Sequence, residues 1–450
     1  MPQARKNCVN KTLGAIARVP AARGRGFARI PDGLLLAAQG LVLLAILAAA
    51  WNARSAMPAV PISDPDTWGY LNPALSWLGG LGFRQTAGRD WLYPAFLAFF
   101  LKSTGSFAGI VFWQKFVGIS SGLVMAIAWK CWVSTLPLRR PTLFLVSMIG
   151  ALPISFQLMN PQSILFEMAI RPEALLPFFV YAQFACLIGY YKFRWQTPSA
   201  LSSVVLGAAA IVLAYACALL KPSWLLAAAL TAAPVFLGIF GSAQSLKTRL
   251  LTPALGFGRK IWVQFTYFLL PKGATFFRDR GDVTRFYRDS VTILDQSLPD
   301  GSRANVRAMY LHYKTEVVAQ AGSDLTLKSK FHACREVIAS LALPLEILFS
   351  LTFASCLVWA RFRDLRSSGW AAASLFCAPL GNAMMVCVVH ALDVERYRLT
   401  YGGFLLFDLT AMAVFIALVI ARFCDIRREC FRMGPTARYT NQPPVPTACN

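Results

Sequence analysis

Charged residues are scarce in this 450-residue sequence, of which they make up 14%. A soluble domain carries about 25% charged residues. Apolar residues make up 56% of the chain, and in water they would leave a large apolar surface exposed. In lipid the same surface needs no polar cover, because lipid tails are as apolar as leucine. The composition therefore argues against an ordinary soluble domain and indicates an integral membrane protein.

The residues and motifs of several chemistries are also missing. Histidine occurs only at His312, His332 and His390, and none of the eleven cysteines forms a Cys-x-x-Cys pair or a metal-ligand cluster with histidine. The sequence therefore predicts no structural zinc and no disulfide framework. It contains no Gly-x-x-x-x-Gly-Lys-Ser/Thr and no Gly-x-Gly-x-x-Gly motif, and its Gly-x-Ser-x-Gly match at Gly118–Gly122 lies inside a continuous apolar run and not at the turn of a nucleophile elbow. Nothing thus supports an α/β-hydrolase or a nucleotide-binding site.

Basic residues outnumber acidic residues by 44 to 21, which gives a net charge of +23. Such an excess could serve nucleic-acid binding. Here, however, the basic residues cluster beside the apolar runs, where basic residues set membrane topology. We therefore expect no nucleic-acid partner.

The apolar residues form continuous runs, which favour membrane-spanning helices over the alternating pattern of a β-barrel. Ten runs are candidates: 34–51, 107–131, 141–158, 173–191, 200–219, 223–240, 256–270, 340–361, 370–391 and 398–422. The run 256–270 is short, but without it the basic loop 362–369 and the basic tail could not both be cytoplasmic. The predicted fold class is all-α, a polytopic transmembrane bundle of about ten helices. Trp91–Leu101 is too short to cross and is predicted to be a helix at the membrane surface.

The distribution of basic residues predicts that both termini are cytoplasmic. The basic cytoplasmic parts are 1–32, 132–140, 192–199, 241–260, 362–369 and the tail 423–450. The parts left outside are the long loop 52–106 after the first helix, 159–172, the polar extracytoplasmic insertion 271–339 and 392–397. The sequence therefore predicts a multi-pass protein of the inner (plasma) membrane.

The first outside loop contains Asp64-Pro65-Asp66. Two carboxylates around a proline could supply a general base or hold a divalent cation, and no other metal site is predicted. Asp64 also fits a helix N-cap with Pro65 at the first helical position. Both interpretations can hold together, with Asp64 as the cap and Asp66 as the reacting group.

Charged residues also occur in the other outside segments. Glu167 and Glu173 flank Arg171, with which they could form a functional site or only a local ion pair at a helix start. Lys221 faces outside against the charge trend, which indicates an anionic partner such as a lipid phosphate, or snorkelling to the interface. Arg396 and Tyr397 could bind a phosphate or form an interfacial anchor belt.

The order of these features resembles the GT-C superfamily of membrane glycosyltransferases, which includes protein O-mannosyltransferases and the aminoarabinose transferase of lipid A. The matching features are an acid four residues before a tyrosine, a surface helix, an early glutamine in the next helix, an acid at a helix start, a Lys-Pro turn and a late Arg-Tyr pair. They correspond to Asp66 and Tyr70, Arg89–Phe96, Trp113–Phe116, Arg171–Leu176, Leu220–Pro222 and Glu395–Tyr397.

The resemblance implies a catalytic module over 33–270 and C-terminal transmembrane helices over 340–422. It implies transfer of a sugar from a polyprenyl phosphate to a glycan, lipid or protein acceptor, with inversion. Asp66, with Asp64, would be the catalytic acid pair, and Glu173, with Glu167, would orient the acceptor or the catalytic acid. The lipid phosphate would be bound by Lys221, Arg396 and Tyr397.

Two other functions stay open. The chain could be a non-enzymatic transporter or flippase of lipid-linked glycans, or an assembly protein without chemistry. Transporters usually bury ionisable residues at mid-membrane, whereas the residues singled out above lie at the outer face. This placement favours a transferase.

Overall fold

The computed structural model describes residues 32–59, 61, 67–83, 89–196, 199–240, 331–389 and 394–432. Asp64, Asp66, the predicted span 256–270, almost all of the insertion 271–339 and nearly all of the basic tail 1–32 lie outside these residues. The chain divides into two units, Met1–Leu41 and Val42–Asn450. The first contributes only the beginning of α2 to the described residues, and all other described helices belong to the second.

Every regular element among the described residues is a helix. The α-helices are α2 (Asp32–Ser55), α3 (Thr67–Leu78), α4 (Leu92–Thr104), α5 (Phe107–Val133), α6 (Arg140–Ile149), α7 (Ala151–Met159), α8 (Pro161–Met168), α9 (Leu176–Trp195), α10 (Ala200–Leu220), α11 (Leu225–Phe240), α16 (Phe331–Val358), α17 (Arg366–Val389) and α18 (Val394–Arg432). The short 3-10 helices are η1 (Pro172–Ala174), η2 (Pro222–Trp224) and η3 (Ala360–Leu365).

Eight stretches in the described part of the chain are long and apolar enough to cross a membrane. They are Gly33–Ser55, Phe107–Val133, Arg140–Met159, Ala200–Leu220, Pro222–Ile239, Ser340–Val358, Ala360–Val386 and Gly402–Arg428. Each overlaps one of the ten predicted spans. The chain is therefore an all-α, polytopic membrane protein, as predicted. The number of crossings and the orientation of the termini stay predictions.

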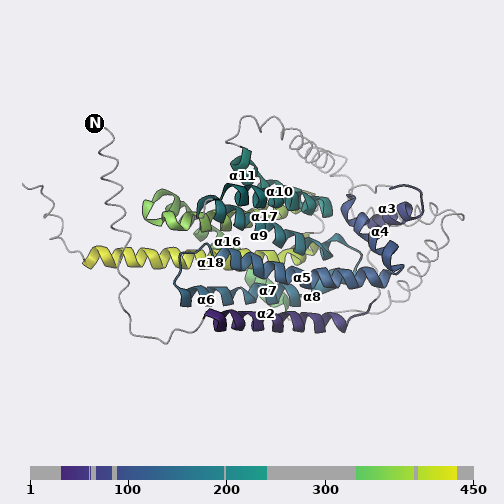
Figure 1. The fold of residues 1–450 in the computed structure, drawn as a ribbon, viewed down its shortest axis with the longest axis horizontal. Helices are drawn as coiled ribbons and strands as arrows, with labels where there is room; N and C mark the ends of the chain where they lie inside the picture. The colour runs from purple at the N-terminus through teal and green to yellow at the C-terminus, as the bar shows by residue number, and fades with distance from the viewer. Residues whose placement is uncertain are drawn as a thin grey trace, which may run out of the picture. The chain divides into compact units, whose positions relative to one another are not determined.

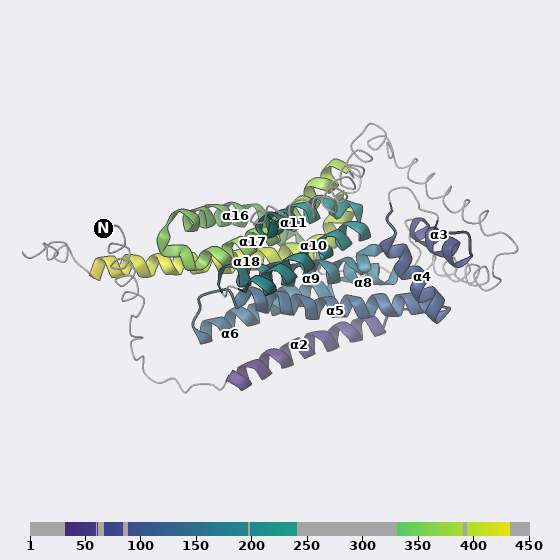
Figure 2. The same cartoon turned by 45° about the horizontal axis from the view of Figure 1, so that its top comes forward.

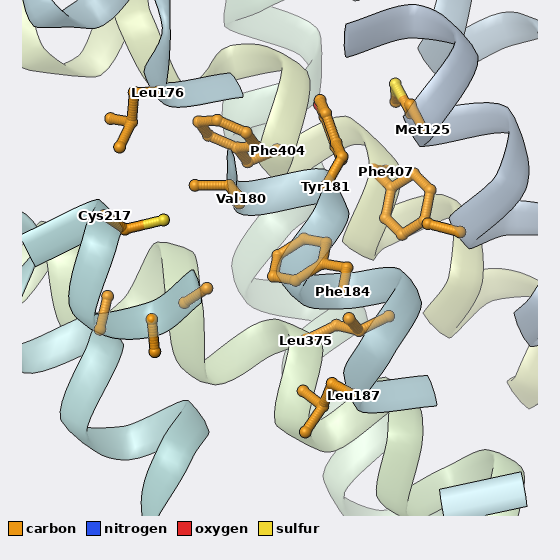
Figure 3. Packing of buried hydrophobic residues seen from close by; sticks show 14 of the residues in the cluster. Met125, Leu176, Val180, Tyr181, Phe184, Leu187, Cys217, Leu375, Phe404 and Phe407 are labelled. Carbon is orange, nitrogen blue, oxygen red and sulfur yellow. The ribbon is translucent and has the colours of Figure 1, made fainter. Parts of the chain in front are cut away.

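The predicted span 173–191 corresponds to α9, which has 20 residues but is more polar than the eight stretches above. It carries Gln183, three tyrosines and two basic residues in its last turn. The bundle accommodates this polarity because α9 packs along α5, α10 and α17, whose labels surround it in Figures 1 and 2. Tyr181, Phe184 and Leu187 are fully buried there, as Figure 3 shows.

The predicted span 141–158 is divided into two helices, α6 and α7, that meet at Gly150. A side chain at Gly150 would collide with the indole of Trp129 on α5. That indole donates a hydrogen bond to the carbonyl oxygen of Val146 at 3.1 Å. Glycine therefore permits a close contact between α5 and the α6–α7 junction.

The loop 52–106, which is predicted to lie outside, contains two helices in the part that the structure describes. The predicted helix Trp91–Leu101 is confirmed as α4, which ends at Gly105 in the left-handed conformation, with φ of 67°. α3 was not predicted as a separate helix, although a helix start was considered at Asp64 and Pro65; Pro73 lies inside it. The two helices pack together through Tyr70 and Tyr93, whose ring centroids are 5.2 Å apart at a T-shaped angle.

Candidate functional site

The candidate site is built around the connection between α8 and α9. Asn160 caps α8 by accepting a hydrogen bond from the backbone N–H of Gln162 at 3.1 Å, and Pro161 occupies the first helical position. Both residue types are favoured at these places. α8 ends at Met168, and an extended segment follows until Pro172 begins η1. Glu167 and Glu173 therefore lie on the two sides of one short extended connection.

Glu167 forms a buried two-point ion pair with Arg54 at the end of α2. Arg54 Nε donates to Glu167 Oε2 at 2.5 Å and Arg54 Nη2 donates to Oε1 at 2.6 Å. The third guanidinium nitrogen donates to the carbonyl oxygens of Leu158 at 2.8 Å and Ala50 at 3.1 Å. Only 1% of Arg54 and 3% of Glu167 are exposed. Sequence reasoning missed Arg54, which fell in the predicted outside loop 52–106 and was not singled out there.

Two neighbours on α5 complete the environment of this pair. A side chain at Gly118 would overlap the Glu167 carboxylate, so glycine provides the space that the carboxylate occupies. Lys115 Nζ donates to the carbonyl oxygens of Arg54, Met57 and Pro58, at 3.0, 3.3 and 3.1 Å. These bonds tie the end of α2 to α5, as expected for a cation at a helix C-terminus.

Burial raises the pKa of Glu167 to about 7, although the Arg54 guanidinium and, more weakly, Lys115 act in the opposite direction. Desolvation disfavours the charged carboxylate, whereas nearby cations favour it. Glu167 therefore titrates close to neutral pH. Its two oxygens are both engaged by Arg54, so this carboxyl holds the α8–η1 connection in place.

Gln114 joins three elements at the same place. Its amide nitrogen donates to the backbone carbonyl oxygens of Glu167 and Ala169, each at 2.8 Å. Its amide oxygen accepts a hydrogen bond from the hydroxyl of Tyr93 at 2.6 Å. The side chain of Gln114 is fully buried. It therefore satisfies the extended backbone between α8 and η1 and links that backbone to α4.

Lys221 and Glu173, two of the predicted site residues, are in direct contact. Lys221 Nζ donates to Glu173 Oε1 at 2.7 Å, and Arg171 Nη2 lies 3.8 Å from the same oxygen. Lys221 stands in an extended conformation between α10 and η2, before Pro222. All three charged residues are at least 94% buried. The local pair of Arg171 with Glu173 is thus present, and Lys221 is added to it from a remote part of the chain.

The structure describes no contact between this cluster and the remaining predicted residues. Asp64 and Asp66 lie outside them, and nothing is described of the side chains of Arg396 and Tyr397, whose backbone belongs to α18. Asp66 directly precedes Thr67, the first residue of α3. Close to this point the guanidinium of Arg89 lies 4.9 Å from the ring centroid of Tyr70.

No group of three or more histidine, cysteine, aspartate or glutamate side chains that could hold a metal ion occurs in the described ranges. The cation predicted for Asp64 and Asp66 is not addressed by this finding, since both residues lie outside those ranges.

A further acidic residue was missed by sequence reasoning. Asp408 lies inside the apolar run of α18 and is 1% exposed, and neither of its carboxylate oxygens has a hydrogen-bond partner among the described residues. The signal was present in the sequence, because a single acid within an apolar span is costly and marks a functional candidate. Ionisable candidates therefore occur inside the bundle as well as at the predicted outer face.

Comparison of the chain with protein-family models, with curated proteins and with solved structures finds no match.

Proposed function

We propose that the chain is a membrane glycosyltransferase that moves a sugar from a polyprenyl-phosphate donor to an acceptor outside the cytoplasm, with inversion. The observation that carries the proposal is the contact between Lys221 and Glu173, which stand 48 positions apart in the chain. The residues chosen as phosphate ligand and as orienting acid meet in one buried cluster, as a shared site for donor and acceptor requires.

The charge of this cluster suits an anion. Lys221 and Arg171 bring two positive charges and Glu173 brings one negative charge, so the cluster carries +1 when all three are ionised. Glu173 orients the ammonium of Lys221. Charge that grows on the leaving phosphate would then be stabilised by a cation whose position is already fixed. Arg396 is the second proposed phosphate ligand, with Tyr397 beside it.

Asp66 is the proposed general base, and Asp64 would share a divalent cation with Asp66. The base would take the proton of the acceptor hydroxyl as this oxygen attacks the anomeric carbon. The bond from that carbon to the phosphate oxygen breaks on the opposite face, which inverts the anomeric centre. Glu167 has a separate role, since its pairing with Arg54 fixes the wall next to Glu173.

The test uses the full chain in liposomes and measures polyprenyl phosphate released from polyprenyl-phosphate mannose and polyprenyl-phosphate aminoarabinose. Lys221→Met should lower the release at least 100-fold, the usual effect of removing one transition-state donor. Asp66→Asn should abolish release without changing thermal stability. Lys192→Met is the matched control, because Lys192 bonds Ser134 at the other end of α9. Release that is unchanged in both site variants would overturn the proposal.

A second function, transport or flipping of a lipid-linked glycan, is favoured by one observation, the buried Asp408. A transporter would move a fluorescent polyprenyl-phosphate sugar between leaflets without releasing polyprenyl phosphate. The same liposomes distinguish the two functions, because only a transferase breaks the bond between sugar and phosphate. Cytoplasmic termini in an inner membrane belong to both proposals and can be tested by protease access to tags on intact cells.

A further inference from the structure

The position of Asp408 is unusual for an acidic side chain. It lies in the membrane-spanning stretch Gly402–Arg428 and is 1% exposed. Both carboxylate oxygens lack a hydrogen-bond partner, and the described residues provide no ion pair to them. Burying an isolated carboxylate in an apolar interior is so costly that such a group normally takes up a proton or a cation. Asp408 therefore needs a bound positive charge.

Glu346 on α16 lies at a matching depth. α16 packs against α18, and short connections before and after α17 make α16 and α18 run in the same direction. Glu346 and Asp408 each stand six residues after the first residue of their spanning stretches, Ser340–Val358 and Gly402–Arg428. The charges of the two carboxyl groups act on each other. The two acidic residues thus lie on neighbouring helices at a similar depth in the bundle.

A further buried polar group, the hydroxyl of Tyr181, belongs to a side chain that packs against α18 near Asp408. The hydroxyl of Tyr181 on α9 has no hydrogen-bond partner in the part of the chain that the structure describes, and the side chain is fully buried. The centroid of its ring lies 5.1 Å from that of Phe404 and 5.8 Å from that of Phe407. Figure 3 shows the three rings close together. Phe404 is one helical turn before Asp408 and shares its face of α18. Tyr181 also interacts electrostatically with Asp408.

The groups around Asp408 distinguish a proton from a metal cation. The titratable groups that act on it are Glu346 of α16, Tyr181 of α9 and Cys377 of α17, and none of them is basic. α7 has no titratable residue, and Glu167 of α8 is held by Arg54. A calcium or magnesium ion would need six or more oxygen ligands, whereas the described residues contain no cluster of three acidic, histidine or cysteine side chains that could hold a metal ion. A proton needs one carboxyl group.

We propose that Asp408 is a reversible proton-binding site inside the bundle, which exchanges its proton with Glu346 and has the Tyr181 hydroxyl as its third polar group. The proton leaves the Asp408 carboxyl for the Glu346 carboxylate, and no other bond changes. Glu346 is only half-buried, and its neighbours Leu343 and Ile347 are 64% and 54% exposed. Of the two carboxyl groups, that of Glu346 is therefore the less buried, and it is the proposed exchange partner of Asp408.

The site goes beyond the proposed transfer reaction, which needs no proton at this depth. Protonatable acids inside membrane helices mark proton relays and substrate pathways. Protonation of Asp408 would change the charge at the contact of α16, α17 and α18, and so could bias the packing of these three helices.

Infrared spectroscopy of the full chain in lipid tests the proposal through the carbonyl-stretch band of protonated carboxyl groups. The wild-type chain should show a band typical of an apolar site, which shifts in D2O and weakens as the pH is raised. Asp408→Asn should remove this band, and Glu346→Gln should keep it but slow its exchange in D2O at least tenfold. Asp425→Asn is the matched control on α18, because the Asp425 side chain is 62% exposed and should not affect the band.

Three results would overturn the proposal. The band could survive in Asp408→Asn, or it could neither exchange in D2O nor respond to pH, which would leave Asp408 a permanently neutral structural residue. Alternatively, Na⁺ or K⁺ could remove the band at constant pH, which would make the ligand a metal cation. If Asp408→Asn does not fold, Asp408→Glu keeps the carboxyl group and should move the band in frequency, and an unmoved band would equally refute the assignment.

Discussion

The buried pair of Arg54 and Glu167 allows a prediction whose direction depends on which partner is removed. At a pH of about 8, above the pKa of Glu167, both groups are charged. Glu167→Met would leave the Arg54 guanidinium buried without its carboxylate. A guanidinium cannot lose its proton in a protein, so the uncompensated charge remains. Removing one partner of a buried pair costs about 3–5 kcal/mol of unfolding free energy, and we expect this variant to lie in that range.

Arg54→Met should cost less, although it removes four hydrogen bonds. Without the guanidinium, the pKa of Glu167 rises further and the carboxyl takes up a proton. The remaining cost is that of a neutral buried polar group with an incomplete set of hydrogen bonds, about 1–3 kcal/mol. The double variant leaves no buried charge, and apolar replacement of such a pair is often neutral. It should therefore exceed Glu167→Met in stability by at least about 2 kcal/mol.

The chain contains its own reporters for this experiment. Cys217 and Cys356 are buried and free, whereas Cys424 is exposed, so once the accessible thiols have been blocked in the folded protein, a thiol-reactive dye labels Cys217 and Cys356 only after unfolding. Unfolding of the full chain by SDS in mixed micelles, followed by dye labelling at about pH 8, would give the free energies of the wild type and the three variants. Asp425→Asn is the control, because changes at an exposed side chain usually stay within about 0.5 kcal/mol.

Two outcomes would contradict this reasoning. Equal losses of unfolding free energy for Glu167→Met and Arg54→Met would show that it makes no difference whether the remaining group can become neutral by gaining or losing a proton. A double variant that loses the sum of both single losses would show that the two side chains do not interact, and that the contact does not hold α2 against the α8–η1 connection.

Three further predictions concern the same region. Burial raises the pKa of Glu167 from 4.5 to about 7, so the part of its stability contribution that comes from holding a proton in the folded state is full below about pH 4.5 and is lost as the pH rises through 7, whereas the pairing of the ionised carboxylate with Arg54 remains above that pH. The stability of wild type relative to Glu167→Gln should therefore fall by about 3 kcal/mol over that window, and a flat difference in SDS unfolding curves would disprove it. Gly118→Ala would press a methyl group against the Glu167 carboxylate and should cost about 1–3 kcal/mol, whereas Gly40→Ala, with open space around it, should cost nothing in the same measurement. Tyr93→Phe leaves the amide oxygen of Gln114 without its donor and should lower the unfolding free energy by about 1–2 kcal/mol, which the labelling assay can resolve.

The sequence could predict the membrane architecture because lipid imposes simple requirements on a chain. Continuous apolar runs must form helices in lipid, where backbone groups can bond only to each other. Eight predicted spans accordingly reappear among the described residues. The division of one span at Gly150 was not predicted, since it depends on the packing of Trp129 from another helix.

The candidate site was only partly predictable. Charged residues near apolar runs stand out in a sequence, and Lys221 and Glu173 were singled out in this way. Their contact could not be foreseen, and neither could the choice of Arg54 as the partner of Glu167, 113 positions away. A charged residue near an apolar run can be recognised in the sequence, but its ion-pair partner depends on which helices pack together.

The sequence by itself thus determined that this protein is helical and lies in a lipid membrane, and that it has few ionisable groups. These properties follow from local composition and from the cost of burying charge. Tertiary structure alone decided which charges neutralise each other, and it left Asp408 without a partner among the described residues. The physical reason is that burial and pairing depend on distances between helices, which no local pattern encodes.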